Sequence, residues 1–471
     1  MMSAARQGMS GVTGTVAAVS TPPGKGGIAV IRVSGSDAFD IADRVFRPKN
    51  GRKLSELPFR MMVYGGIISD GRETDDGMAV LFKGPNSYTG EDTAEISCHG
   101  GPLLTETVLG AVFAAGARPA AAGEFTKRAF LNGRLGLTKA ESVIDLIDAE
   151  SPSQIALASA QSRGILSRRI GDIYDMMKRL ISSIYVFIDF PDEDLSDVPP
   201  AEVESGIVKI EKELESLLET YRTGRSVREG VAACICGKPN VGKSSLLNAL
   251  LGRERAIVTP IAGTTRDVIS EKTRIGRCAV RISDTAGIRS TEDAVELIGT
   301  ERAEAEMRDS ELIIAVFDGS SPLDAEDTAF IERINASASG KAVIAAVNKS
   351  DLDARLDCSE LKKLLPQADI VKISAKDGEV SPLTGLIDGK FTDLSLDLTA
   401  DAVVSSARQY AAISRARDDI ADALVSLRGG FTQDVAALDI EHAMSDLGEV
   451  DGISVSEDVV SDIFSRFCVG K

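Results

Sequence analysis

The sequence predicts a multidomain α/β protein with an N-terminal α+β domain, a discontinuous helical domain and a further α/β domain inserted between the two helical halves. The first observation is length, because 471 residues correspond to about three domains at ~150 residues each. The second is the period of the apolar residues, which changes from short runs to helical spacing and then to strand-like runs along the chain. The third is composition, since 43% hydrophobic and 26% charged residues are typical of globular domains.

The N-terminal part, residues 11–130, contains short apolar runs separated by turn signals. The dipeptide Asp70-Gly71 follows one of these runs and is typical of a two-residue hairpin turn. We therefore expect an α+β domain here. Strands are expected at 15–20, 28–33, 61–68, 78–82 and 94–98, and a helix at 103–115.

Helical spacing begins near Thr138 and continues to about Arg228. Residues 153–188 contain no proline, which predicts a long helix that ends before Pro191. Apolar residues at steps of three and four from Ile207 to Tyr221 predict a second helix.

Helical spacing returns after the centre of the chain, where Gly429-Gly430 is a typical helix stop. Because helices flank the centre on both sides, we expect one helical domain built from residues 131–228 and 391–471. Two separate bundles are the alternative. The later helices are expected at 402–427, 435–447 and 457–467.

The central part contains apolar runs at 231–236, 312–317 and 342–347 that are typical of buried parallel strands. The first run is followed directly by the pattern Gly-x-x-x-x-Gly-Lys-Ser at 237–244, and then by a helical pattern. Such glycines let backbone N–H groups surround phosphates. The motif lysine, Lys243, then reaches the β/γ-phosphate oxygens, and the serine ligates Mg²⁺.

Four more motifs follow in the order expected of a guanine-nucleotide domain. Hydroxyls in 263–267 close over Mg²⁺, and the carboxylate and glycine N–H of 284–287 meet the metal's water shell and the γ-phosphate. Asp351 accepts the N1–H and 2-amino groups that guanine offers and adenine lacks. The triplet 374–376 fits a backbone contact to the guanine oxygen. Together the motifs predict an inserted Ras-like P-loop GTPase domain over 229–390.

The residue after the 284–287 motif is Ile288, where many GTPases place a glutamine that orients the attacking water. Isoleucine cannot orient water, so hydrolysis is slow or another group supplies this function. Glu296 is a candidate, and a solvated helix charge is the alternative interpretation of it.

The charge balance excludes a general phosphate-backbone binder. Lys+Arg number 53 and Asp+Glu 71, which gives a net charge of −18, and phosphate is repelled at long range by such a surface. Aromatic residues make up 4% and tryptophan is absent, which argues against a single-strand-binding platform. Nucleic acid would require a local basic patch or a partner.

The cysteines, the histidines and the hydropathy argue against several other kinds of site and of protein. The six cysteines form no C-x-x-C pair, and the two histidines leave little material for a histidine metal site or a Ser-His-Asp triad. No apolar run approaches the ~18 residues of a membrane span, and no secretory signal is present. We expect a reduced, cytoplasmic protein that does not bind a membrane.

Several motifs outside the central domain resemble those of the MnmE (TrmE) family of tRNA modification GTPases. They are TPPGKGG at 21–27, GPNSYTGED at 84–92, AFLN at 129–132 and the terminal FCVGK at 467–471. The resemblance spans nearly the whole chain. An inserted GTPase domain combined with a terminal C-x-G-K is specific to this family.

The motifs and the resemblance together assign the nucleotide site. Its cofactors are GTP or GDP, Mg²⁺ and K⁺, and the resemblance implies hydrolysis driven by K⁺-dependent pairing of two GTPase domains. The catalytic residues are Lys243, Asp284 and Glu296, the last matching the family's water-orienting glutamate. Mg²⁺ is assigned to Ser244 and Thr265, and K⁺ to Asn240, Thr259, Ile261 and Thr264. The remaining GTP contacts are assigned to Val241, Gly242, Ser245, Thr285, Ala286, Gly287, Asn348, Lys349, Asp351, Ser374, Ala375 and Lys376.

The resemblance also implies that the N-terminal domain binds a tetrahydrofolate derivative. The positions that match the family's folate contacts are Arg32, Glu95, Arg134 and Lys471. Arg134 departs from the expected lysine, and a planar guanidinium is not equivalent to a point donor. From residue chemistry alone, Arg32 and Glu95 would be ordinary strand charges.

Cys468 is a candidate functional thiol near the folate, and a buried structural thiol is the alternative. The glycine and lysine that follow it do not fit a prenylation box. We expect Cys468–Lys471 to project as a short arm that adds nothing to an apolar core and takes part in a site.

The resemblance implies a homodimer, formed through the N-terminal domains and transiently through the GTPase domains. It also implies a complex with the FAD-dependent MnmG (GidA) protein and, as substrate, tRNA. Such proteins install a carboxymethylaminomethyl or aminomethyl group at C5 of the wobble uridine, with a one-carbon unit from the folate. Two other functions remain as alternatives, a regulatory GTPase switch of ribosome assembly and a folate-binding protein whose GTPase controls dimerisation.

Overall fold

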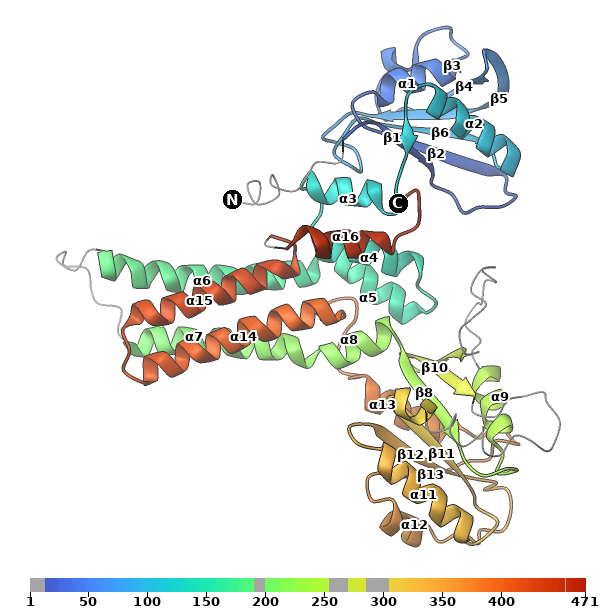
Figure 1. The fold of residues 1–471 in the computed structure, drawn as a ribbon, viewed down its shortest axis with the longest axis vertical. Helices are drawn as coiled ribbons and strands as arrows, with labels where there is room; N and C mark the ends of the chain where they lie inside the picture. Colours follow the sequence, from blue (N-terminus) through green and yellow to red (C-terminus); the bar gives the residue numbers. More distant parts are fainter. Residues whose placement is uncertain (1–12, 190–199, 254–269, 285–304, 454) are drawn as a thin grey trace. The chain divides into compact units, whose positions relative to one another are not determined.

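The computed structural model describes residues 13–189, 200–253, 270–284, 305–453 and 455–471. They divide into two compact units, one formed by Met1–Ile144, Ser162–Pro200 and Asp418–Lys471 and the other by Asp145–Gln161 and Ala201–Arg417. Figure 1 labels the helices and strands along the chain. No helix in the described ranges is long and apolar enough to cross a membrane. The three-domain boundaries expected from the sequence stay a prediction.

The first unit contains a seven-stranded sheet in the order β3-β4-β5-β6-β2-β1-β7. Neighbouring strands are antiparallel except β1 and β7, which run parallel. The predicted strands are present, and the fourth is longer than expected. The bounds are β1 Val16–Val19, β2 Ile28–Ser34, β3 Phe46–Pro48, β4 Val63–Ser69, β5 Arg72–Phe82, β6 Thr93–His99 and β7 Arg118–Pro119.

The turn between β4 and β5 is formed by Asp70 and Gly71, as the sequence predicts. Both residues have positive φ, 51° and 75°, and Ser69 pairs with Arg72 across the turn. Two central residues with positive φ define the type I′ hairpin turn, whose twist matches that of the flanking strands.

One face of this sheet is covered by α1 (Ala38–Val45) and α2 (Pro102–Ala114). Alternate strand residues point into this core, for example Ile31 of β2 and Ile96 of β6, which are fully buried. Their sequence neighbours project from the opposite face, because side chains alternate along a strand. Tyr64 and Ile28 on that face are exposed.

The remaining helices of the first unit include α3 (Glu124–Leu131), α4 (Leu137–Ile147), α6 (Ile165–Asp189), α15 (Gln433–Val450) and α16 (Glu457–Ser465). Phe130 of α3 packs with Phe464 of α16, with ring centroids 6.2 Å apart. Val460, Phe464 and Phe467 are buried in the same small core. The C-terminal segment is therefore anchored beside α3.

The helices of the second unit are α5 (Pro152–Ser162), α7 (Pro200–Glu219), α8 (Tyr221–Arg228), α9 (Lys243–Arg253), α11 (Ala325–Ser337), α12 (Cys358–Leu364) and α13 (Ser381–Phe391). Helix α14 (Ala407–Arg428) extends from this unit into the first. The long helix expected at 153–188 is wrong, because Gly164 adopts a positive φ of 74° and separates α5 from α6. L side chains disfavour that conformation, so glycine ends the helix there.

The helix expected from residue 402 begins at Ala407 instead. The amide oxygen of Gln409 accepts the backbone N–H groups of Ser405 and Ser406. Unpaired N–H groups at a helix start are satisfied in this way by side chains. The predicted stop is correct, since Gly430 has a φ of 82° and Phe431 N donates to Ser426 O.

The second unit contains a six-stranded sheet in the order β13-β12-β11-β8-β10-β9. All pairs are parallel except the edge pair β9–β10. The bounds are β8 Val231–Cys236, β9 Ser270–Ile275, β10 Cys278–Asp284, β11 Leu312–Asp318, β12 Ala342–Asn348 and β13 Asp369–Lys372.

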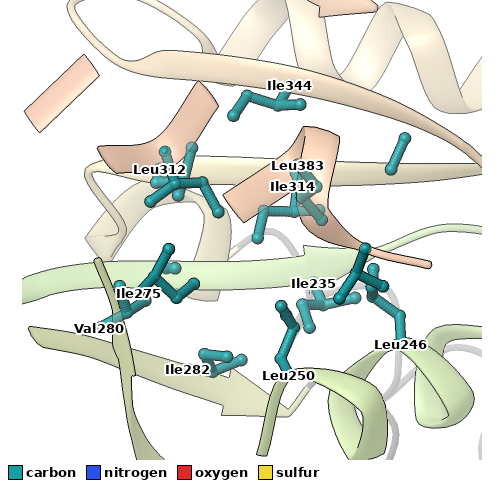
Figure 2. Close-up of a cluster of buried hydrophobic side chains, with 14 of the residues drawn as sticks. Ile235, Leu246, Leu250, Ile275, Val280, Ile282, Leu312, Ile314, Ile344 and Leu383 are labelled. Atoms are coloured by element: carbon teal, nitrogen blue, oxygen red, sulfur yellow. The ribbon is translucent and has the colours of Figure 1, made fainter. Parts of the chain in front are cut away.

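Two apolar cores cover the two faces of this sheet. Ile235, Leu246 and Leu383 belong to one core, which Figure 2 shows in close-up. Cys234 and Phe317 belong to the other. The central strands are thus buried on both faces, which is why their sequences lack polar alternation. The predicted fold class, a multidomain α/β protein with a discontinuous helical part and an inserted P-loop domain, is confirmed.

Candidate functional sites

The nucleotide motifs lie at the carboxyl ends of the parallel strands of the six-stranded sheet. The loop 237–244 follows β8, Asp284 ends β10, Asn348 ends β12, and the triplet 374–376 follows β13. Open α/β sheets bind ligands at this edge. The fold therefore gathers motifs that are more than a hundred residues apart in the sequence.

The phosphate-binding loop depends on two glycines. Gly237 has a φ of 155°, and a Cβ there would lie 2.5 Å from Val316 O. Gly242 has a φ of 100°, and its Cβ would lie 2.2 Å from the side-chain nitrogen of Asn348. The loop thus packs directly against β11 and the base-recognition loop, and only glycine fits at both positions.

Lys243 begins α9 and its ammonium lies inside the loop. Nζ donates to Gly237 O at 2.8 Å and to Lys238 O at 2.7 Å. Ser244 and Ser245 are exposed in the first turn of the same helix. Anions are stabilised at a helix N-terminus, so this arrangement suits a phosphate group.

Asn348 connects the base-recognition motifs to the phosphate loop. Its Nδ2 donates to Val241 O at 2.8 Å, and its Oδ1 accepts from Ala375 N at 2.9 Å. The side chain is buried. Ser374 Oγ donates to Asp351 Oδ1 at 3.0 Å, so the residues predicted to contact guanine lie together.

Several predicted residues fall outside the described ranges. They are Thr259, Ile261, Thr264, Thr265, Thr285, Ala286, Gly287 and Glu296. Asp284 is placed as the last residue of β10, paired with Ile235 of β8. This pairing puts its backbone beside the start of the phosphate loop.

The folate candidates Arg32 and Glu95 form a cross-strand ion pair. They are in register between β2 and β6, and Arg32 donates from Nε at 2.9 Å and from Nη2 at 2.8 Å to Glu95 Oε1. The guanidinium also lies 5.3 Å from the ring centroid of Tyr88 and 5.6 Å from that of Phe125. Both ring contacts hold it in a fixed place.

The other two folate candidates lie near the same loops. Phe125 N donates to Lys471 O at 3.2 Å, which brings the chain end to the start of α3. Arg134 is exposed, and a Cβ built on Gly90 would lie 3.2 Å from its Cγ. Because Gly90 follows the Tyr88–Thr89 stretch of the 84–92 loop, the four candidates surround α3 and this loop.

Cys468 is exposed and lines a different feature, a cavity of about 1020 Å³. The cavity lies beside α2, on the side of Ala29, whereas Arg32 and Glu95 project from the opposite face of the sheet. Residues 21–26 also line the cavity. The thiol and the Arg32–Glu95 pair therefore line separate surfaces of this unit.

The expectation that Cys468–Lys471 projects as an arm is wrong. Val469 pairs with Ala122 in an antiparallel bridge, Gly123 N donates to Cys468 O at 3.4 Å, and Ser20 Oγ donates to Gly470 O at 3.1 Å. Unsatisfied backbone groups find these partners because the segment follows the anchored α16. The tail is thus docked between β1 and α3.

Sequence reasoning missed several residues that support these sites. Tyr88 lies in the 84–92 motif, and burial raises the pKa of its hydroxyl above the ordinary value. Asp318 ends β11 and accepts from Lys349 Nζ at 2.6 Å. Burial would raise the pKa of Asp318, but hydrogen bonds from Lys349 and Ser320 lower it below its usual range. A carboxylate at the end of a buried strand was the available signal.

Comparisons with known proteins match nearly the whole chain. A family model described as the GTP-binding protein TrmE N-terminus matches residues 15–134, and one described as the MnmE helical domain matches residues 137–468. Relatives named tRNA modification GTPase MnmE occur in Symbiobacterium thermophilum and Heliobacterium modesticaldum. They are 41% and 42% identical over 466 residues, 97% of this chain and 99% of each relative. A crystal structure of Aquifex aeolicus Era is 27% identical over 40% of this chain and 66% of that chain, and its TM-score of 0.28 is too low to support an argument.

Proposed function

The chain belongs to the MnmE family of tRNA modification GTPases, and from this premise we propose that it is the GTP-hydrolysing subunit of a machinery that modifies the wobble uridine of tRNA at C5. The observation that carries the proposal is the gathering of the phosphate loop, Asp284 and the base-recognition loops at one sheet edge. A site of this kind, and not the fold alone, is the basis for assigning an activity.

The loop 237–244 is proposed to bind the phosphates through its backbone N–H groups. Lys243 exchanges the loop carbonyls for the β- and γ-phosphate oxygens. Mg²⁺ would be held by Ser244 and Thr265, with Asp284 at its water shell, and would supply charge neutralisation of the phosphates. Asp351 accepts two guanine N–H groups and so selects the base.

Hydrolysis is proposed to depend on K⁺ and on Glu296, because Ile288 cannot orient water. Asn240, in the phosphate loop, is exposed and has a φ of 64°, so its side-chain oxygen is available to a cation. Thr259, Ile261 and Thr264 complete the proposed K⁺ site. Positive charge at this place substitutes for an arginine finger.

A reduced folate is proposed as the one-carbon donor, bound through Arg32, Glu95, Arg134 and Lys471. Cys468, which lines the separate cavity beside α2, is not part of this proposed set of contacts. The Arg32 guanidinium near the rings of Tyr88 and Phe125 supports the proposal, because a planar, hydrogen-bonding group beside aromatic surface suits a flat ligand. The FAD-dependent MnmG (GidA) protein is the proposed partner, and tRNA the proposed substrate.

A homodimer through the N-terminal sheets is also proposed. The sheet face opposite α1 and α2 carries Ile28, 67% exposed, and Tyr64, 51% exposed. Tyr64 of β4 is paired with Met78 of β5, and Met78 is paired with Ser97 of β6. The part of this face that carries Ile28 and Tyr64 is exposed, whereas Arg32 on the same face is packed against Tyr88 and Phe125. Exposed apolar side chains on a sheet face are typical of an interaction surface.

The decisive test is deletion of the gene followed by nucleoside analysis of tRNA. We expect loss of the C5 modification of the wobble uridine and its return with the wild-type gene. Normal modification in the deletion strain would contradict the proposal and favour a ribosome-assembly switch or a folate-dependent dimer.

Purified protein tests the hydrolysis step. GTP turnover in K⁺ should exceed turnover in Na⁺, and Glu296→Ala should lower turnover by ~10²-fold or more, the scale of a lost acid/base group, with GTP affinity little changed. Equal rates in K⁺ and Na⁺ would refute the proposed substitution of K⁺ for an arginine finger.

A further inference from the structure

We propose that the segment Asp318–Asp327, which connects β11 to α11, positions both loops of the nucleotide site. It does so through two lysines, Lys238 of the phosphate loop and Lys349 of the base-recognition loop. The inference rests on the proposed GTP binding and adds Asp318, Asp324 and Asp327, which no nucleotide motif contains, as positioning residues. We call Asp318–Asp327 the bracing segment.

Lys238 binds the far end of the bracing segment. Its Nζ lies 2.6 Å from Asp324 Oδ2 and 2.8 Å from Asp327 Oδ2. The lysine side chain is 19% exposed and that of Asp327 is 9% exposed. Charge-assisted hydrogen bonds are stronger than neutral ones, and partial burial reduces their screening.

The two carboxylates are themselves fixed by the start of α11. Asp327 N donates to Asp324 Oδ1 at 2.9 Å, and Asp324 N donates to Asp327 Oδ2 at 3.1 Å. This reciprocal pattern is a capping box. Lys238 therefore binds to groups whose positions are set before any ligand is present, so the phosphate loop is tied to a rigid helix end.

The position of Lys238 bears directly on Lys243. Lys238 O accepts from Lys243 Nζ at 2.7 Å. Lys238 therefore binds the bracing segment through its side chain and Lys243, the lysine proposed to reach the phosphates, through its backbone. In addition, Lys238 offsets two negative charges that stand beside the loop. Without it, Asp324 and Asp327 would repel a triphosphate.

Lys349 binds the near end of the bracing segment. It has a φ of 66°, a strained conformation for a residue with a side chain. Its Nζ donates to Asp318 Oδ2 at 2.6 Å, while Asp318 Oδ1 accepts from Ser320 N at 2.9 Å. A backbone hydrogen bond also connects the segment to the base-recognition loop, since Gly319 N donates to Asn348 O at 2.8 Å.

These contacts differ from ordinary surface ion pairs, which contribute little because they are exposed and mobile. Both lysines belong to nucleotide loops, and both partners belong to one segment of ten residues with fixed ends. A shift of that segment would move the two loops together. Productive binding needs both loops in place at once, so the bracing segment affects affinity without touching the ligand.

The first experiment compares Lys238→Met and Lys238→Arg with the wild-type full chain, by titration with labelled GTP and GDP. Lys238→Met removes both charge-assisted hydrogen bonds and should weaken GTP binding about tenfold, the scale of such interactions, and GDP binding less. Its KM for GTP should rise more than its kcat falls. Lys238→Arg should restore most of the affinity, since the positive charge is kept.

Lys390→Met is the matched control, because Lys390 Nζ lies 2.5 Å from Asp369 Oδ2 in the same domain but in neither nucleotide loop. It should leave GTP and GDP affinity unchanged. If Lys238→Met and Lys390→Met lower the melting temperature alike and neither changes GTP affinity, the role of Lys238 is structural only and the proposal is overturned.

The second experiment uses Asp318→Asn, with Asp369→Asn as its control. Because Asp318 acts through the base-recognition loop, GTP and GDP affinity should fall by the same factor, about tenfold. Equal affinities in Asp318→Asn and Asp369→Asn would overturn the role of Asp318. Wild-type protein that binds no GTP would instead refute the proposed function, so the two failures are distinguishable.

Discussion

At the residue scale, Asp351 is the residue proposed to select guanine over other bases. Its Oδ1 accepts from Ser374 Oγ, which leaves Oδ2 and the second lone pair of Oδ1 for guanine. Asp351→Asn should weaken GTP binding by ~10²-fold or more and improve binding of XTP, because xanthine presents a carbonyl where guanine presents an amino group. Competition of GTP, XTP and ATP for the wild-type and variant proteins measures this. A variant that keeps GTP affinity and gains none for XTP would show that the motif assignment is wrong.

His99 gives a residue-scale prediction for pH. Its hydrogen bond with Asp75, 2.8 Å from Nδ1, raises the pKa of the imidazole above its usual value. A group whose pKa is higher in the folded than in the unfolded state stabilises the fold below the unfolded pKa of ~6.5, and that contribution disappears as pH rises through the folded pKa.

The His99 prediction can be measured by NMR titration of the two histidines, with His442→Gln to identify the signals. Asp75→Asn should lower the pKa of His99 and remove the additional stability at pH 6 relative to pH 8. An unchanged titration of His99 in Asp75→Asn would show that the ion pair does not form in solution.

Residues in motifs were predictable because nucleotide chemistry demands particular groups at fixed spacing. The partners of Asp318 and Asp324 were not predictable, since they depend on where β11 ends and α11 begins relative to Lys349 and Lys238. Nothing in the local sequence around an aspartate shows which lysine it meets from another loop.

At the scale of elements, the docked tail is the feature that sequence reasoning placed wrongly. The pattern of Val460, Phe464 and Phe467 predicted the anchored helix α16 correctly. It could not show that the backbone of Ala122 and the side-chain hydroxyl of Ser20 would pair with the residues beyond. Such pairing depends on tertiary position, which the local sequence of the tail does not show.

The tail prediction follows from Gly470. Its φ is 100°, and a Cβ there would lie 2.1 Å from Val19 O, so Gly470→Ala should displace the tail. Given the proposed folate site, we expect weaker reduced-folate binding and loss of uridine modification, with basal GTP hydrolysis near wild type. Deletion of Cys468–Lys471 should act alike.

Arg466→Ala is the control for this prediction, because that side chain is exposed and pairs only with Asp462 of its own helix in the described structure. Folate titration, GTPase assay and tRNA nucleoside analysis on the three variants give the answer. A Gly470→Ala protein that binds folate and modifies tRNA normally would contradict the role of the docked tail.

At the scale of the whole molecule, changes of apolar period predicted the order of the sheets and helices. The prediction works because the residues that face a core must be apolar, and they recur with the period of the helix or strand that carries them. The break at Gly164 and the late start of α14 were missed. The break depends on the backbone conformation of one glycine, and the late start depends on one side-chain cap. A pattern read over many residues does not detect such single-residue features.

The last prediction concerns the inserted domain, expected at 229–390. All residues of its two cores lie between Val231 and Phe391, so residues 229–391 expressed alone should fold and bind GTP with affinity close to that of the full chain. A piece ending at residue 380 is the control, because it lacks the buried Leu383, Ile387 and Phe391 of α13. Each such side chain contributes ~1.5–3 kcal/mol, and together they approach the ~5–15 kcal/mol of a typical domain. Circular dichroism during urea unfolding should show one cooperative transition for the longer piece and none for the shorter. A longer piece that does not unfold cooperatively would show that the domain depends on the helices around it.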